Sequence, residues 1–521
     1  MMDPFVPYDV EPYSDFSDPH VSDGFRATVE AVRGRLGADW PLVIDGERID
    51  TGDWIASHDP CKPGRLVGRA AAGGPEQIEA AFQAALRAQP AWGALPAAHR
   101  ARALVKLAAV MRRRKWELSA WEVFEAGKNY AEAEGDVAEA IDFCEYYARQ
   151  AMDLDDALDT YTYDGEENTA FLQPIGVGVV IPPWNFLLAI LTGITVGPVV
   201  AGNAVILKPS PKTPIIAGLF MEMLDEAGFP PGVVNLLTGE DAVLGDALVE
   251  DPRTRFVNFT GSVGTGQRIY EKAAKVQPGQ RHLKKAFLEM GGKDGMIVDE
   301  TADLDAAADA AVAGAFGFQG QKCSAMSRLI VVDAVHDALV EKVVDRTRKL
   351  SVGPAEDDHD VCAVIDQAQF DKIAGYLDTA KQEGTVLLGG EPAPGAGPDG
   401  GWFVQPTLIR DVAPDATIAQ EEIFGPVVAI LRARDFDHAL EIANDTPFAL
   451  TGGLFSRLRS RIERARREFR VGNLYVNRKI TGSLVGIQPF GGFDMSGTNS
   501  KAGGPDYVRL FLEAKTVTER F

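Results

Sequence analysis

Cys323 is the residue whose surroundings most clearly indicate chemistry. It lies in the stretch GAFGFQGQKCSAMSR, residues 314–328, between Lys322 and Ser324 and with no histidine beside it. Most free cysteines are small residues that pack in the core, so a purely structural role is the alternative interpretation of Cys323. The small residues and glutamines that precede Cys323 instead predict a turn that presents a reactive thiol. A thiol needs activation to act as a nucleophile, so the sequence must supply another group.

A carboxylate that could serve as a base is Glu289, in the stretch FLEMGGKDGMIV. It follows apolar residues and precedes Gly291 and Gly292, which places it where a strand gives way to a loop. The helix-like stretch 301–317 separates it from Cys323, and such a span can bring both residues to one cleft. The two side chains could then divide the roles of nucleophile and base, although a solvated loop glutamate is the alternative.

A glycine-rich turn precedes a helical pattern in FTGSVGTGQRIYEKAAK, where Gly261, Gly264 and Gly266 come before the helix. Backbone N–H groups and the helix dipole at such a place can face a phosphate. The spacing is not G-x-G-x-x-G, so this motif alone is a weak indication of a dinucleotide site.

The elements that would position these residues alternate between strands and helices. Short apolar runs predict strands, and longer apolar stretches predict helices. The expected strands are 176–181, 203–210, 232–239 and 254–262, and the expected helices are 187–202, 213–228 and 241–251. This alternation predicts an α/β fold whose parallel sheet is covered on both faces. Pro182, Pro183 and Pro198 interrupt the apolar region 175–209, which argues against a membrane-spanning helix.

Composition sets the class of molecule. The chain has 521 residues, 46% hydrophobic and 24% charged, which is typical of a folded protein of two to four domains. A net charge of −23 argues against a nucleic-acid partner. The acidic N-terminus does not resemble a secretory signal, and the spacing of the four cysteines supports neither a disulfide framework nor a C-x-x-C zinc site. We therefore expect a cytoplasmic protein that acts on a small molecule, with no membrane partner.

Five motifs, in order along the chain, together resemble the aldehyde dehydrogenase superfamily. They are PPWNF with Asn185, LKPS with Lys208, LEMGG with Glu289, GQKCS with Cys323, and EEIFGPV with Glu422 and Phe424. The resemblance implies the aldehyde dehydrogenase fold: a Rossmann-like cofactor domain, an α/β catalytic domain and a β-hairpin oligomerisation arm. Three further features resemble the branch that oxidises L-glutamate γ-semialdehyde to L-glutamate in proline breakdown, without a metal. These are GFQGQKCSAMSR, TGSLVGIQPFGGFDMSGTNSKAGG and the long acidic N-terminal extension.

The resemblance implies domain boundaries as well. Residues 1–154 and 174–287 would bind NAD, with residues 471–489 returning to that domain, and residues 288–470 would form the catalytic domain. Residues 155–173 and 490–521 would form the arm and tail, with a hairpin turn around Asp164 and Gly165. We expect a homo-oligomer built from dimers, with a hexamer as one form.

The resemblance also assigns roles to the catalytic and cofactor residues. Cys323 would attack the aldehyde, the Asn185 amide and the Cys323 N–H would hold the oxyanion, and Glu289 would activate water. The cofactor residues would be Lys208 and Ser210 at the adenosine ribose, Gly261, Ser262 and Gly266 at the pyrophosphate, Glu422 at the nicotinamide ribose, and Phe424 beside that ring. Many NAD-preferring relatives have a glutamate where this chain has Pro211, so NAD is favoured while NADP use stays open.

Substrate recognition is expected on the other side of Cys323. Ser324, Gly482 and Ser483, with Lys322 nearby, would bind the α-carboxylate. Phe186 and Phe490 would clamp the aliphatic chain, and Glu139 would receive the ammonium group unless it is an exposed helix carboxylate.

Four alternatives stay open at this point. One is a semialdehyde dehydrogenase of the same superfamily with another substrate, and one is a coenzyme-A-acylating relative, which generally lacks the base. A papain-like hydrolase would need a histidine partner that no motif supplies. A binding or structural relative without activity is the last.

Overall fold

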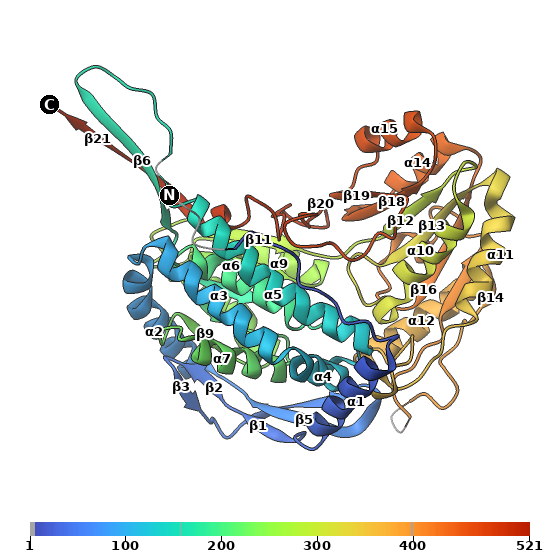
Figure 1. Ribbon diagram of the computed structural model, residues 1–521, viewed down its shortest axis with the longest axis horizontal. Coiled ribbons are helices and arrows are strands. Elements are labelled where there is room, and N and C mark those ends of the chain that lie inside the picture. Colours follow the sequence, from blue (N-terminus) through green and yellow to red (C-terminus); the bar gives the residue numbers. More distant parts are fainter. Residues whose placement is uncertain (1–5, 157, 398–399) are drawn as a thin grey trace.

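The protein contains two seven-stranded sheets flanked by helices, and a two-stranded arm that projects from the body (Figure 1). The computed structural model describes residues 6–156, 158–397 and 400–521. The α/β class expected from the alternating pattern is confirmed.

The first sheet has five parallel strands and an antiparallel edge. Its order is β11–β10–β7–β8–β9–β2–β3. The strands are β11 (Lys285–Glu289), β10 (Phe256–Thr260), β7 (Val177–Ile181), β8 (Ala204–Leu207), β9 (Val234–Leu236), β2 (Leu42–Ile44) and β3 (Glu47–Ile49). β7, β8 and β9 are apolar and almost wholly buried, as expected for strands covered on both faces.

Helices cover both faces of this sheet. On one face lie α2 (Pro75–Gly93), α8 (Asp241–Glu250) and α9 (Val263–Ala274). On the other lie α6 (Ala189–Val200) and α7 (Ile215–Ala227), behind which pack α3 (Ala97–Arg113), α4 (Lys115–Ala126) and α5 (Tyr130–Asp153). The apolar region 175–209 therefore forms β7, α6 and β8, as predicted. Within the described ranges, no helix has both the length and the apolar character needed to cross a membrane.

The second sheet has the order β14–β15–β16–β13–β12–β18–β19, and β14 is its antiparallel member. The strands are β14 (Thr385–Leu388), β15 (Thr407–Arg410), β16 (Val427–Ala433), β13 (Met326–Val332), β12 (Asp294–Val298), β18 (Thr451–Phe455) and β19 (Asn473–Val476). Its helices are α10 (Leu304–Phe316), α11 (His336–Thr347), α12 (Gln367–Glu383), α13 (Thr417–Gln420), α14 (Phe436–Asn444) and α15 (Arg459–Glu468). Because β19 still belongs to this sheet, the sheet extends past the boundary expected at residue 470.

The arm consists of β6 (Glu166–Pro174) and β21 (Leu512–Arg520), paired antiparallel from Pro174↔Leu512 to Glu166↔Arg520. Figure 1 shows the two strands extending together from the body. A turn does form at Gly165, which has a φ of 78° and is closed by the Tyr163↔Glu166 bridge. The turn lies where the sequence predicts one, and the continuous ladder of β6 is formed with the C-terminal strand. The preceding segment contributes only isolated bridges, such as Leu158↔Ala170.

Smaller elements complete the fold. β1 (Ala38–Trp40), β5 (Lys62–Ala71) and β4 (Trp54–Asp59) form a three-stranded sheet, and β17 (Phe448–Ala449) pairs with β20 (Phe493–Asp494). The first helix, α1 (Pro19–Arg33), follows an extended N-terminal segment.

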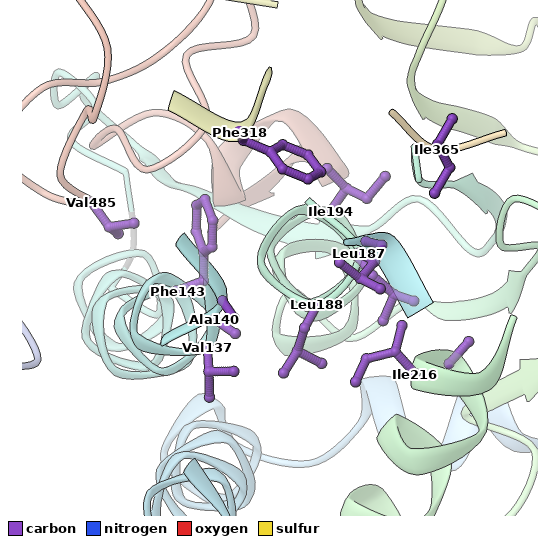
Figure 2. Packing of buried hydrophobic residues seen from close by; sticks show 14 of the residues in the cluster. Val137, Ala140, Phe143, Leu187, Leu188, Ile194, Ile216, Phe318, Ile365 and Val485 are labelled. Atoms are coloured by element: carbon purple, nitrogen blue, oxygen red, sulfur yellow. The ribbon is translucent and has the colours of Figure 1, made fainter. Parts of the chain in front are cut away.

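The contact between α5 and α6 is the part of the core that bears most directly on the site. Figure 2 shows Val137 and Phe143 of α5 together with Ile194 of α6 and Leu188, the residue just before α6. A Cβ added at Gly193 would lie 2.8 Å from the Phe143 ring, so this glycine lets the two helices approach closely. Phe143 and Ile194 also line a cavity, which makes this contact part of the cavity wall.

Candidate active site

Cys323 lies where two cavities meet. One cavity has a volume of about 650 Å³ and opens over the carboxyl ends of the first sheet, and the other has about 440 Å³ and lies beside α5. Cys323 lines both of them. The carboxyl ends of parallel strands are where α/β folds place their ligands.

A left-handed turn presents this cysteine. Phe318, Gln319 and Gly320 have φ values of 48°, 56° and 67°, a conformation that is strained for side chains other than glycine. The Gln319 amide donates to the carbonyls of Gly127 and Ala363, at 3.0 and 3.1 Å, and holds the strained turn in place. The turn predicted from the glutamines is confirmed.

The surroundings of Cys323 disfavour its thiolate form. Its pKa is raised well above the usual value, first by burial and then by the carboxylates of Asp294, Glu422 and Glu289. The neighbouring Lys322 does not offset this, because its ammonium pairs with Glu132 at 2.6 Å. Lys322, which the sequence suggested as an activator of the thiol, therefore forms part of the wall of the smaller cavity.

Asn185 is buried in the loop between β7 and α6 and lines the larger cavity. Its Nδ2 donates to the Gln321 carbonyl at 3.0 Å, which fixes the amide beside the cysteine loop and leaves one N–H for another acceptor. In the described part of the chain, the backbone N–H of Cys323 donates to no other group. These two donors have the composition of an oxyanion hole.

Glu289 ends β11 and lines the smaller cavity. Its Oε1 accepts from the Ser500 hydroxyl at 3.1 Å, and its Oε2 has no partner among the described residues. Burial raises the pKa of this carboxyl to about 8, and the Ser500 hydrogen bond only partly opposes the effect. The group can therefore change protonation near neutral pH, which suits a general base.

The larger cavity brings together six of the seven residues predicted to bind the cofactor. They are Lys208, Ser210, Gly261, Ser262, Glu422 and Phe424. Gly266 lies outside the lining of this cavity, and its role at the pyrophosphate stays a prediction. A Cβ there would lie 2.3 Å from the Met290 sulfur, so Gly266 lets α9 pack closely against that residue.

Several features of this cavity suit an anionic dinucleotide. Ser262 caps the N-terminus of α9, whose first N–H groups and dipole favour a phosphate. The Lys208 ammonium is buried and pairs with Asp241. Glu422 Oε1 accepts from the Gly292 N–H at 3.1 Å. Phe424 meets the Trp184 ring edge-on, with 5.4 Å between ring centroids.

The smaller cavity brings together all seven residues predicted to bind the substrate. They are Ser324, Gly482, Ser483, Phe186, Phe490, Lys322 and Glu139. Gly482 has a φ of 75°, which explains why the chain has glycine in this loop. Arg478 braces the loop by donating to the Thr481 and Gly482 carbonyls, at 3.2 and 3.1 Å.

Four acidic residues of α5 line the same cavity, and cations neutralise three of them. Glu132 pairs with Lys322, Glu134 with Lys115 at 3.1 Å, and Asp136 with Lys128. In the part of the chain that the structure describes, the Glu139 carboxyl has neither an ion pair nor a hydrogen bond. Burial, followed by the charges of Asp136 and Asp142, raises its pKa to about 8. Glu139 is thus the carboxyl of this group that is available to a cationic ligand.

Sequence reasoning missed several residues of this site. Tyr13 lines the smaller cavity from the N-terminal segment, Tyr475 bonds to Ser483, and Ser500 bonds to Glu289. Lys128 lies 5.1 Å from the ring centroids of Phe186 and Phe318. Of these residues, only Lys128 has a local sequence signal beside it. Gly127, the residue before it, is typical of the C-terminal end of a helix, here α4.

Comparison with known proteins assigns this fold and site to a class. The model of the Aldehyde dehydrogenase family matches residues 49–517, and the chain belongs to that family. The chain is 53% identical over 517 residues to 1-pyrroline-5-carboxylate dehydrogenase of Geobacillus thermodenitrificans (strain NG80-2), covering 99% of both chains. It is 50% identical over 518 residues to the Bacillus subtilis (strain 168) protein of the same name, covering 99% of this chain and 100% of the other.

Solved structures agree with this assignment. A crystal structure of 1-pyrroline-5-carboxylate dehydrogenase from Thermus with bound NAD matches with a TM-score of 0.98 at 50% identity, covering 100% of both chains. Proline utilization A from Bdellovibrio bacteriovorus matches with a TM-score of 0.95 at 42% identity, over 99% of this chain and 53% of that one. The family and fold predicted from the five motifs are confirmed.

Proposed function

We propose that this protein oxidises L-glutamate γ-semialdehyde, the open form of Δ1-pyrroline-5-carboxylate, to L-glutamate, with NAD as the oxidant, in proline catabolism. The observation that carries the proposal is the meeting of two different cavities at Cys323. One has the donors for a dinucleotide, and the other has an unpaired carboxyl and a glycine–serine loop that suit the two ends of an amino acid. The full-length similarity to 1-pyrroline-5-carboxylate dehydrogenases supports the same substrate.

The residues of the larger cavity fit NAD. Ser262 and the N-terminus of α9 would hold the pyrophosphate, Lys208 and Ser210 the adenosine ribose, and Glu422 the nicotinamide ribose, with Phe424 beside that ring. When bound, NAD supplies the hydride acceptor. The Thermus relative has been solved with bound NAD.

NAD is proposed over NADP, although the position of Pro211 lacks a glutamate that would repel a 2′-phosphate. Lys212 next to it forms an ion pair with Asp366 at 2.6 Å. Because the Asp366 carboxylate already pairs with the Lys212 ammonium, Lys212 is not free to bind a 2′-phosphate.

Cys323 forms the covalent intermediate. The thiol first gives its proton to solvent water, and the thiolate sulfur then bonds to the aldehyde carbon as the C=O π bond breaks and the oxygen becomes an oxyanion. The free N–H of the Asn185 amide and the N–H of Cys323 stabilise that oxyanion, at about 3 kcal/mol per donor. Loss of hydride from the same carbon leaves a thioester on Cys323.

Glu289 completes the reaction. Its carboxylate takes a proton from water as the water oxygen bonds to the thioester carbon, and the C–S bond then breaks to give the acid and restore the thiol. A coenzyme-A-acylating enzyme would not need this base. The position of Glu289 in the cavity therefore favours hydrolysis.

The smaller cavity reads both ends of the substrate. Gly482, Ser483 and Ser324, with Lys322 nearby, bind the α-carboxylate, and Glu139 receives the ammonium group. Phe186 and Phe490 enclose the aliphatic chain between these ends.

The larger organisation is also part of the proposal. The first sheet and its helices form the NAD-binding domain and the second sheet forms the catalytic domain, joined near residue 288. The β6–β21 arm pairs subunits into a dimer-based homo-oligomer, which sedimentation of the full-length protein and of a chain ending at Phe511 would test. We place the enzyme in the cytoplasm, because Cys323 must stay a thiol to act.

A panel of semialdehydes, followed by NADH absorbance at 340 nm, tests the substrate. We expect the highest kcat/KM with L-glutamate γ-semialdehyde. Faster turnover of succinate semialdehyde or a simple alkanal would contradict the substrate and leave the family unchanged. Thioester formation that depends on coenzyme A would contradict hydrolysis.

A further inference from the structure

The N-terminal segment, residues 6–18, lies along α5 before α1 begins (Figure 1). Several hydrogen bonds hold it in place. The Tyr8 hydroxyl donates to the Val485 carbonyl at 2.8 Å, and the N–H groups of Glu11 and Ser14 donate to the carboxylates of Asp142 and Glu134, both at 2.8 Å. The segment thus connects the loop that carries Ser483 to the acidic face of α5.

Tyr13 lies on this segment at the mouth of the substrate cavity. It lines the cavity together with Ser14, and its side chain remains 56% exposed. The Cε1 atom of its ring is 4.0 Å from the place that a Cβ on Gly135 would occupy. Gly135 precedes Glu139 by one helical turn, so both lie on the same face of α5. The aromatic ring therefore stands close to the unpaired carboxyl of the cavity.

This pairing suits an ammonium group. The face of an aromatic ring attracts a cation within about 6 Å, and a nearby carboxylate supplies the opposite charge. Partial burial, followed by the charge of Glu139, raises the pKa of Tyr13 to about 12, which agrees with their proximity.

The segment lies outside the residues that the family model matches. The family model begins at residue 49, whereas the similarity to the 1-pyrroline-5-carboxylate dehydrogenases covers 99% of the chain.

We propose that the N-terminal segment is a specificity element of the substrate cavity, and that Tyr13 acts with Glu139 to select an aldehyde that carries an ammonium group. This inference rests on the proposed function. The segment contributes Tyr13 and Ser14 to the lining of the substrate cavity, whose other lining residues lie between residues 131 and 507.

The test compares L-glutamate γ-semialdehyde with 5-oxopentanoate, which has the same chain and carboxylate but no amino group. The measured quantity is the ratio of kcat/KM for the two aldehydes. We expect Tyr13→Ala to lower this ratio about three- to tenfold, through KM for the amino substrate, and Tyr13→Phe to retain most of the preference. Tyr270→Ala is the matched control, because Tyr270 is a similarly exposed tyrosine, at 59%, on α9. In a Glu139→Gln background, Tyr13→Ala should change the ratio less, because the two residues act together.

Two outcomes would overturn the role of Tyr13 while leaving the proposed function intact. One is a ratio of kcat/KM for the two aldehydes that is the same in Tyr13→Ala as in the wild type. The other is an equal loss of kcat/KM on both aldehydes, which is expected if Tyr13 only supports the structure of the cavity. If the wild-type enzyme itself does not distinguish the two aldehydes, the proposed substrate fails, and the inference fails with it.

Discussion

The hydroxyl groups of Tyr475 and Ser483 form a hydrogen bond, which ties the proposed carboxylate loop to strand β19 of the second sheet. Tyr475 is buried, and the guanidinium of Arg478 lies 4.8 Å from its ring centroid. The serine hydroxyl can accept from the tyrosine and still donate to a substrate carboxylate. Tyr475 is therefore a positioning residue for the group that would read the substrate.

Tyr475→Phe removes only this hydroxyl, and it should raise KM for L-glutamate γ-semialdehyde about fivefold, because a neutral hydrogen bond contributes about 1 kcal/mol. Ser483→Ala should raise KM further, since a hydrogen bond to a charged group is worth roughly 1.5–3 kcal/mol. Steady-state kinetics with this substrate and with a simple alkanal provide the measurement. Equal losses on both aldehydes would show that the loop supports the scaffold and does not read the carboxylate.

Replacing Cys323 by Ala should abolish NADH formation and leave dinucleotide binding intact, because the sulfur is needed only for bond formation. NAD titration by calorimetry and the 340 nm assay measure the two properties separately. Cys144→Ala is the control. Cys144 is a fully buried cysteine of α5, and its loss should affect packing more than chemistry. Near-normal turnover in Cys323→Ala would refute the nucleophile assignment.

Glu289 should act after hydride transfer, and its raised pKa makes that step sensitive to pH. Below a pKa of about 8 the carboxyl is protonated and cannot accept a proton from water, so steady-state turnover should rise as pH increases towards 8. Glu289→Gln should keep a single-turnover burst of NADH but show slow, pH-insensitive steady-state turnover. If burst and steady state disappear together, Glu289 activates the thiol instead.

Sequence reasoning was reliable where the signal is local. The apolar runs of residues 175–209 gave the strand–helix–strand order, and the glutamines before Cys323 gave a turn. It was incomplete where a contact joins distant residues. The ladder between β6 and β21 pairs segments more than 330 positions apart, and the grouping of these segments in one arm came from the family resemblance, since no local pattern marks the partner strand. Tyr13 lies in a segment without helical or strand periodicity, so no local pattern marks it. At Gly266 packing and binding both favour glycine, so the residue type alone does not separate the two roles.

Glu139 should make ammonium binding depend on pH. Its carboxyl has a pKa of about 8 without ligand, so binding an ammonium group at lower pH requires the loss of a proton. The inhibition constant of L-glutamate against the aldehyde should therefore fall about tenfold per pH unit between pH 6.5 and 7.5, and level off above about 8. Glutarate has the same two carboxylates but no amino group, and its inhibition should not strengthen in this way. Glu139→Gln has no proton to lose, so it should bind L-glutamate weakly and with little pH dependence. A parallel pH response of L-glutamate and glutarate would show instead that the carboxylate end, or Glu289, governs the effect.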